Sequence, residues 1–357
     1  MDIIIYNETI MRFSIRGILT LATLVLLALV VWAAWPEIKQ AWRLMNDVEL
    51  WLLALLIPIQ FLSYYAAGSM IFSYLKAKGN LNDMSHWSMT RLALEFNFVN
   101  HVLPSGGAAG FSYMTWVLGC HKVPAARATM AQIVRLLLMF VSFVLLMLIA
   151  VAVLAVNDKV DRTIVGVTLL LTAATIGAVF FVVWLIQSTV RLQKFSNWIT
   201  NLVNGFMYRV SRKKIKEAVK YEKIYGFLSG LHEDYNSIQA EHNILVKPFL
   251  WGMLANILDV GLIWVSFWAL GSVVDPAVLF VAFGIASIAG ALSVTPGGAG
   301  VYEAVMVAFL AATGVPPDVA IAGTLLARVI LLAATIVFGY AFYQLTVFKY
   351  GKRPAER

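Results

Sequence analysis

The feature that most constrains this chain is a series of long stretches that contain no Asp, Glu, Lys or Arg. Six of them cover residues 17–36, 51–74, 136–156, 164–189, 277–302 and 329–348, and a seventh, 248–269, is interrupted only by Asp259. About 20 residues of helix cross hydrocarbon about 30 Å thick, so each stretch is long enough. Within lipid only helices and closed barrels satisfy their backbone, and these stretches lack the alternation of barrel strands. The expected fold is all-α: a polytopic transmembrane helical bundle, one domain over residues 1–357.

Composition excludes most other classes of protein. Of the 357 residues, 61% are hydrophobic and 13% charged, whereas a soluble domain is roughly 45–50% apolar and about 25% charged. The single cysteine, Cys120, permits neither an internal disulfide nor a cysteine-based zinc site. No Walker A loop, serine-hydrolase elbow, HExxH or dinucleotide motif is present. We therefore expect no enzyme activity, no catalytic residues, no cofactor and no metal.

The first apolar stretch could be a cleaved signal peptide, because Arg12 and Arg16 precede it. However, the stretch is long, and Trp35 and Pro36 stand where a small-residue cleavage site would be needed. We therefore predict an uncleaved first span.

The distribution of Lys and Arg predicts the orientation. If the spans are as above, 21 Lys/Arg lie on the side of both termini and of the loop 187–247, and four lie on the other side. By the positive-inside rule both termini are cytoplasmic, and the protein is expected in the plasma membrane. The net charge of +8 is thus explained by the membrane rather than by nucleic acid, which is not expected as a partner.

Two apolar regions, about 93–119 and 277–312, each begin and end on one predicted side, and each has a Pro/Gly break near its middle. We interpret both as re-entrant hairpins of two broken half-helices. The alternative is two short ordinary spans in each region. Counting membrane crossings does not distinguish a re-entrant hairpin from two short spans, because two spans also return the chain to the side on which it started.

The two breaks resemble each other. The first reads Leu103-Pro104-Ser105-Gly106-Gly107-Ala108-Ala109-Gly110, and the second reads Val294-Thr295-Pro296-Gly297-Gly298-Ala299-Gly300. A long span precedes each break, and an arginine inside an apolar run follows each one, Arg135 in the first copy and Arg328 in the second. The repeats, about 50–156 and about 248–346, would be inverted in the membrane, as in many secondary transporters. The alternative is a chance recurrence of a common glycine-rich sequence.

In such transporters, matched Pro/Gly interruptions point to the substrate site. Glycine permits left-handed turns and close approach to the backbone, and the start of a half-helix offers free N–H groups to an anion. The candidate cradle residues are Pro104, Gly106, Gly107, Pro296, Gly297, Gly298 and Gly300. Their alternative role is structural, in tight turns and close helix packing.

Five charged side chains fall within predicted membrane segments: Glu95, Arg135, Asp259, Glu303 and Arg328. A charge at a helix centre costs about 2.5–3.5 kcal/mol on insertion scales, so each needs a partner or a wet cavity. Two guanidinium groups at related positions could hold one phosphate near mid-membrane. The alternative is two structural salt bridges, Arg328 with Glu303 and Arg135 with Glu95.

The other candidate binding residues are neighbours of these charges. Asn256 shares a helix face with Asp259, Asn100 continues the polar start of the first hairpin at Glu95, and Tyr302 precedes Glu303.

The loop 187–247 contains a predicted amphipathic helix with basic residues close by. Its apolar face is formed by Trp198, Ile199, Leu202, Val203 and Phe206. We interpret it as a cytoplasmic helix on the anionic leaflet, and the alternative is a helix packed in solvent.

The run Pro296-Gly297-Gly298-Ala299-Gly300-Val301-Tyr302-Glu303 resembles the P-G-G-x-G-x-x-E signature of the lysylphosphatidylglycerol synthase transmembrane region family, or flippase-like membrane proteins. The resemblance covers roughly residues 17–345. It implies a part that moves charged lipid between leaflets, and full-length synthases add a cytosolic aminoacyl-transferase domain. That domain is not expected here, so the resemblance implies lipid translocation or binding rather than lysyl transfer.

The predicted function is therefore binding and translocation of a phospholipid or lipid-linked headgroup, anionic or phosphate-bearing. One alternative is a gradient-driven carrier of a small anionic solute. Another is a non-catalytic membrane subunit that partners a separately encoded glycosyl- or aminoacyl-transferase. The oligomeric state stays open.

Overall fold

A computed structural model describes Trp35 and residues 49–350, apart from residues 83, 104–107, 157–161, 211–219, 294, 296 and 297. The first predicted span, 17–36, lies almost wholly outside the described residues. No strand occurs in the described part of the chain, which confirms the all-α class. Five described helices are long and apolar enough to cross a membrane: Trp51–Ala77, Ala125–Val156, Ile164–Ile186, His242–Ala269 and Pro317–Tyr350. The protein is a multi-pass membrane protein.

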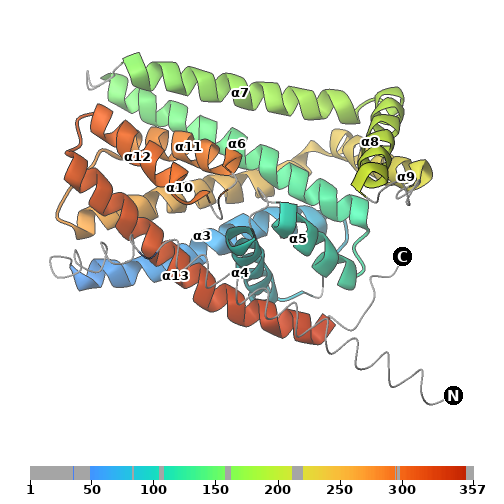
Figure 1. The fold of residues 1–357 in the computed structure, drawn as a ribbon, viewed down its shortest axis with the longest axis horizontal. Helices are drawn as coiled ribbons and strands as arrows, with labels where there is room; N and C mark the ends of the chain where they lie inside the picture. Colours follow the sequence, from blue (N-terminus) through green and yellow to red (C-terminus); the bar gives the residue numbers. More distant parts are fainter. Residues whose placement is uncertain are drawn as a thin grey trace.

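Two sets of four helices make up most of the bundle (Figure 1). The first set is α3 (Leu50–Ala77), α4 (His86–Val102), α5 (Ala108–Cys120) and α6 (Ala125–Val156), with 28, 17, 13 and 32 residues. The second set is α10 (Val246–Ala269), α11 (Pro276–Leu292), α12 (Val301–Ala312) and α13 (Pro317–Tyr350), with 24, 17, 12 and 34 residues. The two sets therefore repeat the order long, short, short, long.

The helix contacts also pair the two sets. The two leading helices, α3 and α10, pack along each other at the centre. The second helix of each hairpin packs on the last helix of its own set, α5 on α6 and α12 on α13. The first helix of each hairpin packs on the last helix of the other set, α4 on α13 and α11 on α6. The inverted repeat stays a prediction, which this exchange of partners supports.

The short helices match the two predicted hairpins. At 1.5 Å per residue, α5 and α12 are only about 20 Å long, less than the hydrocarbon thickness of about 30 Å. Each of these regions is therefore divided into two helices that meet at a break. Whether the pairs re-enter the membrane or form short spans is an open prediction.

Capping residues explain where several helices begin and end. The hydroxyl of Ser85 accepts a hydrogen bond from the backbone N–H of Ser88 at 3.2 Å, and Asp275 caps α11 in front of Pro276. Glycines in the left-handed region follow the other ends, Gly271 with φ 73° after α10 and Gly314 with φ 93° after α12.

Both arginines lie inside long helices, as expected, and these helices begin well before the uncharged stretches. The uncharged stretches begin just after Arg135 and Arg328, whereas α6 begins at Ala125 and α13 at Pro317. An α-helix satisfies its backbone whatever its side chains are, so a buried charge with neighbours to neutralise it does not end the helix. Both arginines consequently project from helix interiors.

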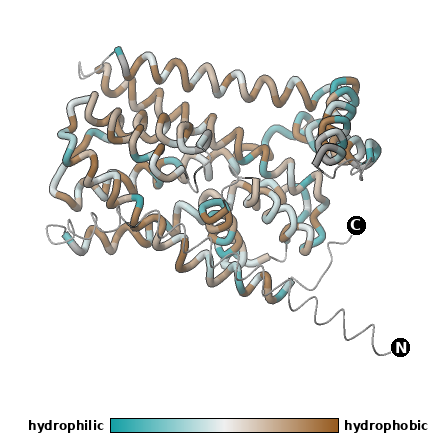
Figure 2. Tube along the Cα trace, viewed as in Figure 1, coloured by the Kyte–Doolittle hydropathy of each residue, from teal (hydrophilic) through white to brown (hydrophobic). Residues whose placement is uncertain are grey.

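Between the two sets run α7 (Arg162–Ile186), α8 (Thr189–Val210), α9 (Tyr221–Ala240) and a 3-10 turn, η2 (His242–Leu245). Only 11% of the most apolar window of α7 is buried inside the protein, against 50% for α3. Figure 2 shows hydrophobic residues along α7 and hydrophilic residues gathered in α8 and α9. The helix α7 therefore presents its apolar side chains to lipid.

The helices α8 and α9 lie at one end of the bundle (Figure 1). Arg127, near the start of α6, bonds Asp234 of α9 at 3.3 Å, and Lys78 after α3 bonds Ser237. Burial lowers the pKa of Lys78 from its ordinary value. On α8, Trp198 and Leu202 are exposed, as expected of a helix on a membrane surface. That surface role stays a prediction.

Candidate functional site

One cavity of about 380 Å³, the central cavity, lies between the end of α4 and the α11–α12 break. The end of α4 and the residue after it line one side of the cavity, and the α11–α12 break lines another. Helices α3, α10 and α13 complete the wall. The structure therefore brings together two segments that lie almost 200 residues apart in the sequence.

The first break is held by Asn100, which lines the cavity. Its side-chain Oδ1 accepts a hydrogen bond from the backbone N–H of Gly110 at 3.0 Å, near the start of α5. A Cβ on Gly110 would lie 2.1 Å from that oxygen, so a larger residue would displace the Asn100 amide and break this hydrogen bond. This explains the last glycine of the first break in structural terms.

The second break needs two glycines in left-handed conformations, Gly298 with φ 74° and Gly300 with φ 84°. A Cβ on Gly298 would come within 2.8 Å of the Cα of Gly290 on α11, so backbone packs against backbone here. The carboxylate of Glu303 accepts the N–H of Gly300 at 2.7 Å and so caps α12. The predicted turn role of these glycines is therefore present.

Arg328 lies on the cavity wall, and the residue is 8% exposed. Its Nε donates to Oε1 of Glu303 at 2.6 Å, and its Cζ lies 4.6 Å from the centre of the Tyr302 ring. The Arg328–Glu303 salt bridge that the sequence left as an alternative therefore exists. It does not exclude ligand binding, because the same guanidinium lines the cavity.

Arg135 stands next to this cavity rather than on its wall. Its Cζ lies 4.8 Å from the centre of the Phe96 ring, and it interacts electrostatically with Asp259, which does line the cavity. Asp259 also accepts a hydrogen bond from the Ser63 hydroxyl across the α3–α10 contact. Among the described residues the Nε of Arg135 has no hydrogen-bond partner, although it is buried. A buried guanidinium nitrogen without an acceptor is an unusual feature that a ligand would explain.

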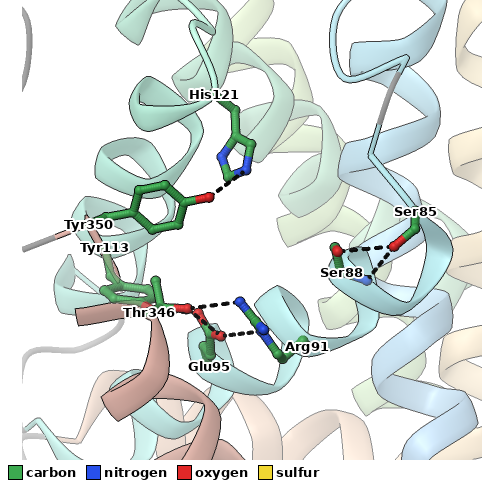
Figure 3. Close-up of polar contacts among 8 residues, drawn as sticks. All are labelled: Ser85, Ser88, Arg91, Glu95, Tyr113, His121, Thr346 and Tyr350. Carbon is green, nitrogen blue, oxygen red and sulfur yellow. Dashed lines mark hydrogen bonds and ion pairs between the residues drawn. The ribbon is translucent and has the colours of Figure 1, made fainter. Parts of the chain in front are cut away.

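Two predicted site residues lie elsewhere. Asn256 donates to Met139 O at 3.0 Å and to the Ser142 hydroxyl at 2.9 Å, so it joins α10 to α6. Glu95 does not pair with Arg135. It pairs with Arg91 at 3.2 Å in a separate cluster between α4 and α13 (Figure 3). Neither residue lines the central cavity, although Asn256 lines the adjoining apolar pocket between α6, α7, α10 and α11.

The remaining predicted residues lie outside the described residues. These are Pro104, Gly106, Gly107, Pro296 and Gly297. Their role as a cradle for an anion is untested.

The structure adds polar residues that the sequence reasoning missed. Gln60 and Tyr64 of α3 line the cavity, as does Thr324 of α13, whose buried hydroxyl has no hydrogen-bond partner among described atoms. A signal was present, because Gln60 and Tyr64 are four residues apart in an apolar helix, and Thr324 is four before Arg328. Polar side chains at this spacing mark one face of a membrane helix.

The described side chains include no group of three or more His, Cys, Asp or Glu that could hold a metal ion. The cavity wall carries the guanidinium of Arg328, the carboxyl group of Asp259, neutral hydrogen-bonding side chains and aromatic rings. Such a surface can bind and orient an anionic or amphiphilic molecule.

Comparisons with known proteins agree with this architecture. A family model described as the lysylphosphatidylglycerol synthase TM region matches residues 19–339. A UPF0104 membrane protein of Methanothermobacter thermautotrophicus is 23% identical over 237 residues, 65% of this chain and 67% of that protein. Another UPF0104 membrane protein, from Methanocaldococcus jannaschii, is 32% identical over 118 residues, 32% of this chain and 35% of that protein. No solved structure gives a significant match.

Proposed function

The chain belongs to the lysylphosphatidylglycerol synthase TM region family, and from that premise we propose that it binds a phosphate-bearing lipid headgroup and moves the lipid between leaflets. The observation that carries the proposal is the central cavity, with Arg328 on its wall. Its volume of about 380 Å³ lies within the range of roughly 300–1,000 Å³ that is usual for small-molecule sites.

Arg328 is the main contact for phosphate in this proposal. Tyr302 packs against its guanidinium, and Glu303 neutralises it while the cavity is empty of anion. An arriving phosphate replaces Glu303 as partner, while Glu303 keeps its bond to the Gly300 N–H. Arg135 of the first set and Asp259 of the second set supply a second charge pair, of which Asp259 lines the cavity.

An apolar pocket beside the cavity favours a lipid over a soluble anion. This pocket of about 190 Å³ lies between α6, α7, α10 and α11, and it shares Phe283 and Ser287 with the central cavity. Its lining is almost entirely apolar, with Phe140, Phe143 and Leu171 among its residues. A molecule with a charged head and an acyl chain fits two adjoining spaces of this kind.

Transport would proceed by rocking one set of helices against the other. The contacts of α4 with α13 and of α11 with α6 cross between the sets, so a change in them would open the cavity to one side or the other. The plasma membrane location and the cytoplasmic placement of the basic end belong to the same proposal.

The test is lipid scrambling in phosphatidylcholine liposomes that contain fluorescent phosphatidylglycerol. The double variant Arg328→Gln with Glu303→Gln removes the charge without leaving one member of the pair unpaired, so the fold should persist. We expect transport to fall at least about tenfold, the loss of one charge-assisted contact. Arg191→Gln on α8 removes an equal charge away from the cavity and should transport normally.

Two results would overturn the proposal. One is undiminished scrambling by the double variant. The other is uptake of a soluble phosphate ester such as glycerol 3-phosphate by liposomes in which no lipid is scrambled, which would establish the solute carrier instead.

A further inference from the structure

A second cavity lies at the end of the bundle that also carries α8 and α9. It has a volume of about 640 Å³ and is enclosed by the segment after α3, the start of α4, the α5–α6 connection and the end of α13. It shares no lining residue with the central cavity. The function proposed above does not use it.

The charges around this cavity are mainly positive. Arg91, Lys122 and Lys349 line it, against the single carboxylate of Glu95 among the described lining residues. None of the ion pairs between described residues involves Lys122 or Lys349. Both lysines are exposed at the rim. The cavity therefore has an excess of positive charge that an anion would balance.

The one carboxylate is fully engaged by the protein. Tyr113 donates to Glu95 Oε2 at 2.7 Å, while Thr346 and Arg91 donate to Oε1 at 2.8 Å and 3.2 Å (Figure 3). Glu95 is 1% exposed, so it offers no competing negative surface. Its role is to hold Arg91, which is partly exposed, at the inner wall of the cavity.

Neutral donors complete the lining. Ser85 and Ser88, at the start of α4, face the cavity, and no acidic residue stands in the first turn of this 17-residue helix. Across the cavity, Tyr350 at the end of α13 bonds the ring of His121 at 3.4 Å (Figure 3). Hydroxyls and a positive helix end around a basic cavity are the groups that bind phosphate.

Two residues that line this cavity have a left-handed backbone. Leu81 and Lys122, with φ of 60° and 63°, are the non-glycine residues with positive φ among those described. At Lys122 this conformation ends α5, because the N–H of Lys122 bonds Gly119 O at 2.9 Å and the N–H of Val123 bonds Leu118 O at 3.1 Å. Asn80, next to Leu81, accepts a hydrogen bond from Arg127 at 3.1 Å. These contacts fix the two connections that line the cavity.

We propose that this cavity is a second anion site, which binds a phosphate-bearing group through Arg91, Lys122, Lys349 and the start of α4. The group is either a lipid headgroup from the adjacent leaflet or a soluble phosphate compound. The site stands independently of lipid transport through the central cavity.

The experiment uses the full chain in phosphatidylcholine nanodiscs. One arm titrates inorganic pyrophosphate by calorimetry, and the other adds phosphatidate to the nanodiscs and measures its retention by native mass spectrometry. The variant combines Lys122→Asn with Lys349→Gln, because asparagine tolerates the left-handed backbone at position 122. The control combines Lys194→Gln with Lys247→Gln, which removes equal charge from exposed positions outside the cavity.

We expect the variant to weaken anion binding about tenfold or more, while the control binds within about twofold of the unaltered chain. A loss in the pyrophosphate arm assigns a soluble ligand, and a loss in the phosphatidate arm alone assigns a headgroup. Binding that is equal in variant, control and unaltered chain in both arms overturns the site. Because the variant leaves Arg328 and Glu303 intact, this outcome is distinct from failure of the transport proposal.

Discussion

At the scale of single residues, the charges inside the bundle are arranged as local pairs. Glu303 accepts hydrogen bonds from both Arg328 and the N–H of Gly300, and it is 7% exposed. Arg135 differs, since its Nε has no hydrogen-bond partner among the described residues. The pairs explain how charged residues are tolerated in an apolar bundle.

The first prediction concerns the stability of the Arg328–Glu303 pair. Breaking a buried pair from one side leaves an unbalanced charge, so Arg328→Gln alone should lower the free energy of unfolding by about 3–5 kcal/mol. Adding Glu303→Gln should restore part of the lost free energy of unfolding, because both side chains are then neutral and no unpaired charge is buried. Denaturant titration in mixed micelles, followed by tryptophan fluorescence, measures both. Equal losses in the single and double variants would refute the coupling, and Lys194→Gln at an exposed position of α8 should change stability by less than about 0.5 kcal/mol.

At the scale of elements, the broken helices depend on a few backbone positions. Gly298 combines a left-handed φ of 74° with direct packing on Gly290, whereas Gly177 in α7 has open space around it. The same residue type therefore serves two purposes. In the break it permits the turn, and in the lipid-facing helix nothing in its surroundings requires it.

The second prediction compares these two glycines. Gly298→Ala should destabilise the protein by about 1–3 kcal/mol, through backbone strain and the clash with Gly290. Gly177→Ala should be neutral or stabilising by up to about 1 kcal/mol, because alanine favours the helix. Thermal unfolding of both variants in the same detergent provides the measurement. If the two shifts were alike, the turn at Gly298 would not be strained as described.

At the scale of the whole molecule, the two sets of helices meet along α3 and α10 and exchange their hairpin contacts. Most described basic connections lie at the end with α8 and α9. The predicted orientation places that end in the cytoplasm and the α10–α11 and α12–α13 connections outside. This orientation decides which leaflet the second anion site would face.

The third prediction tests the orientation by cysteine labelling in a Cys120→Ser background. Val273, between α10 and α11, is 76% exposed, and Glu222 on α9 is exposed at the opposite end. An impermeant maleimide should label Val273→Cys on intact cells and label Glu222→Cys only after permeabilisation. The Cys120→Ser chain is the unlabelled control. The reverse pattern would place the basic end outside.

The sequence by itself determined the class of the protein. Uncharged stretches of about 20 residues have one stable arrangement in lipid, so helices, membrane location and the division of 93–119 and 277–312 into short helices followed from local composition. The Pro-Gly-Gly motif likewise predicted the family to which the chain belongs.

Only the tertiary structure decided which polar residues share a cavity. In the sequence, Asn256 and Glu95 are polar residues within apolar segments, just as Asp259 and Glu303 are. In the structure, however, Asn256 bonds Ser142 and Glu95 bonds Arg91. Helix rotation and crossing determine such neighbours, through packing between residues far apart in the chain. The central cavity and the second basic cavity therefore became visible only once α4 was placed against α13 and α11 against α6.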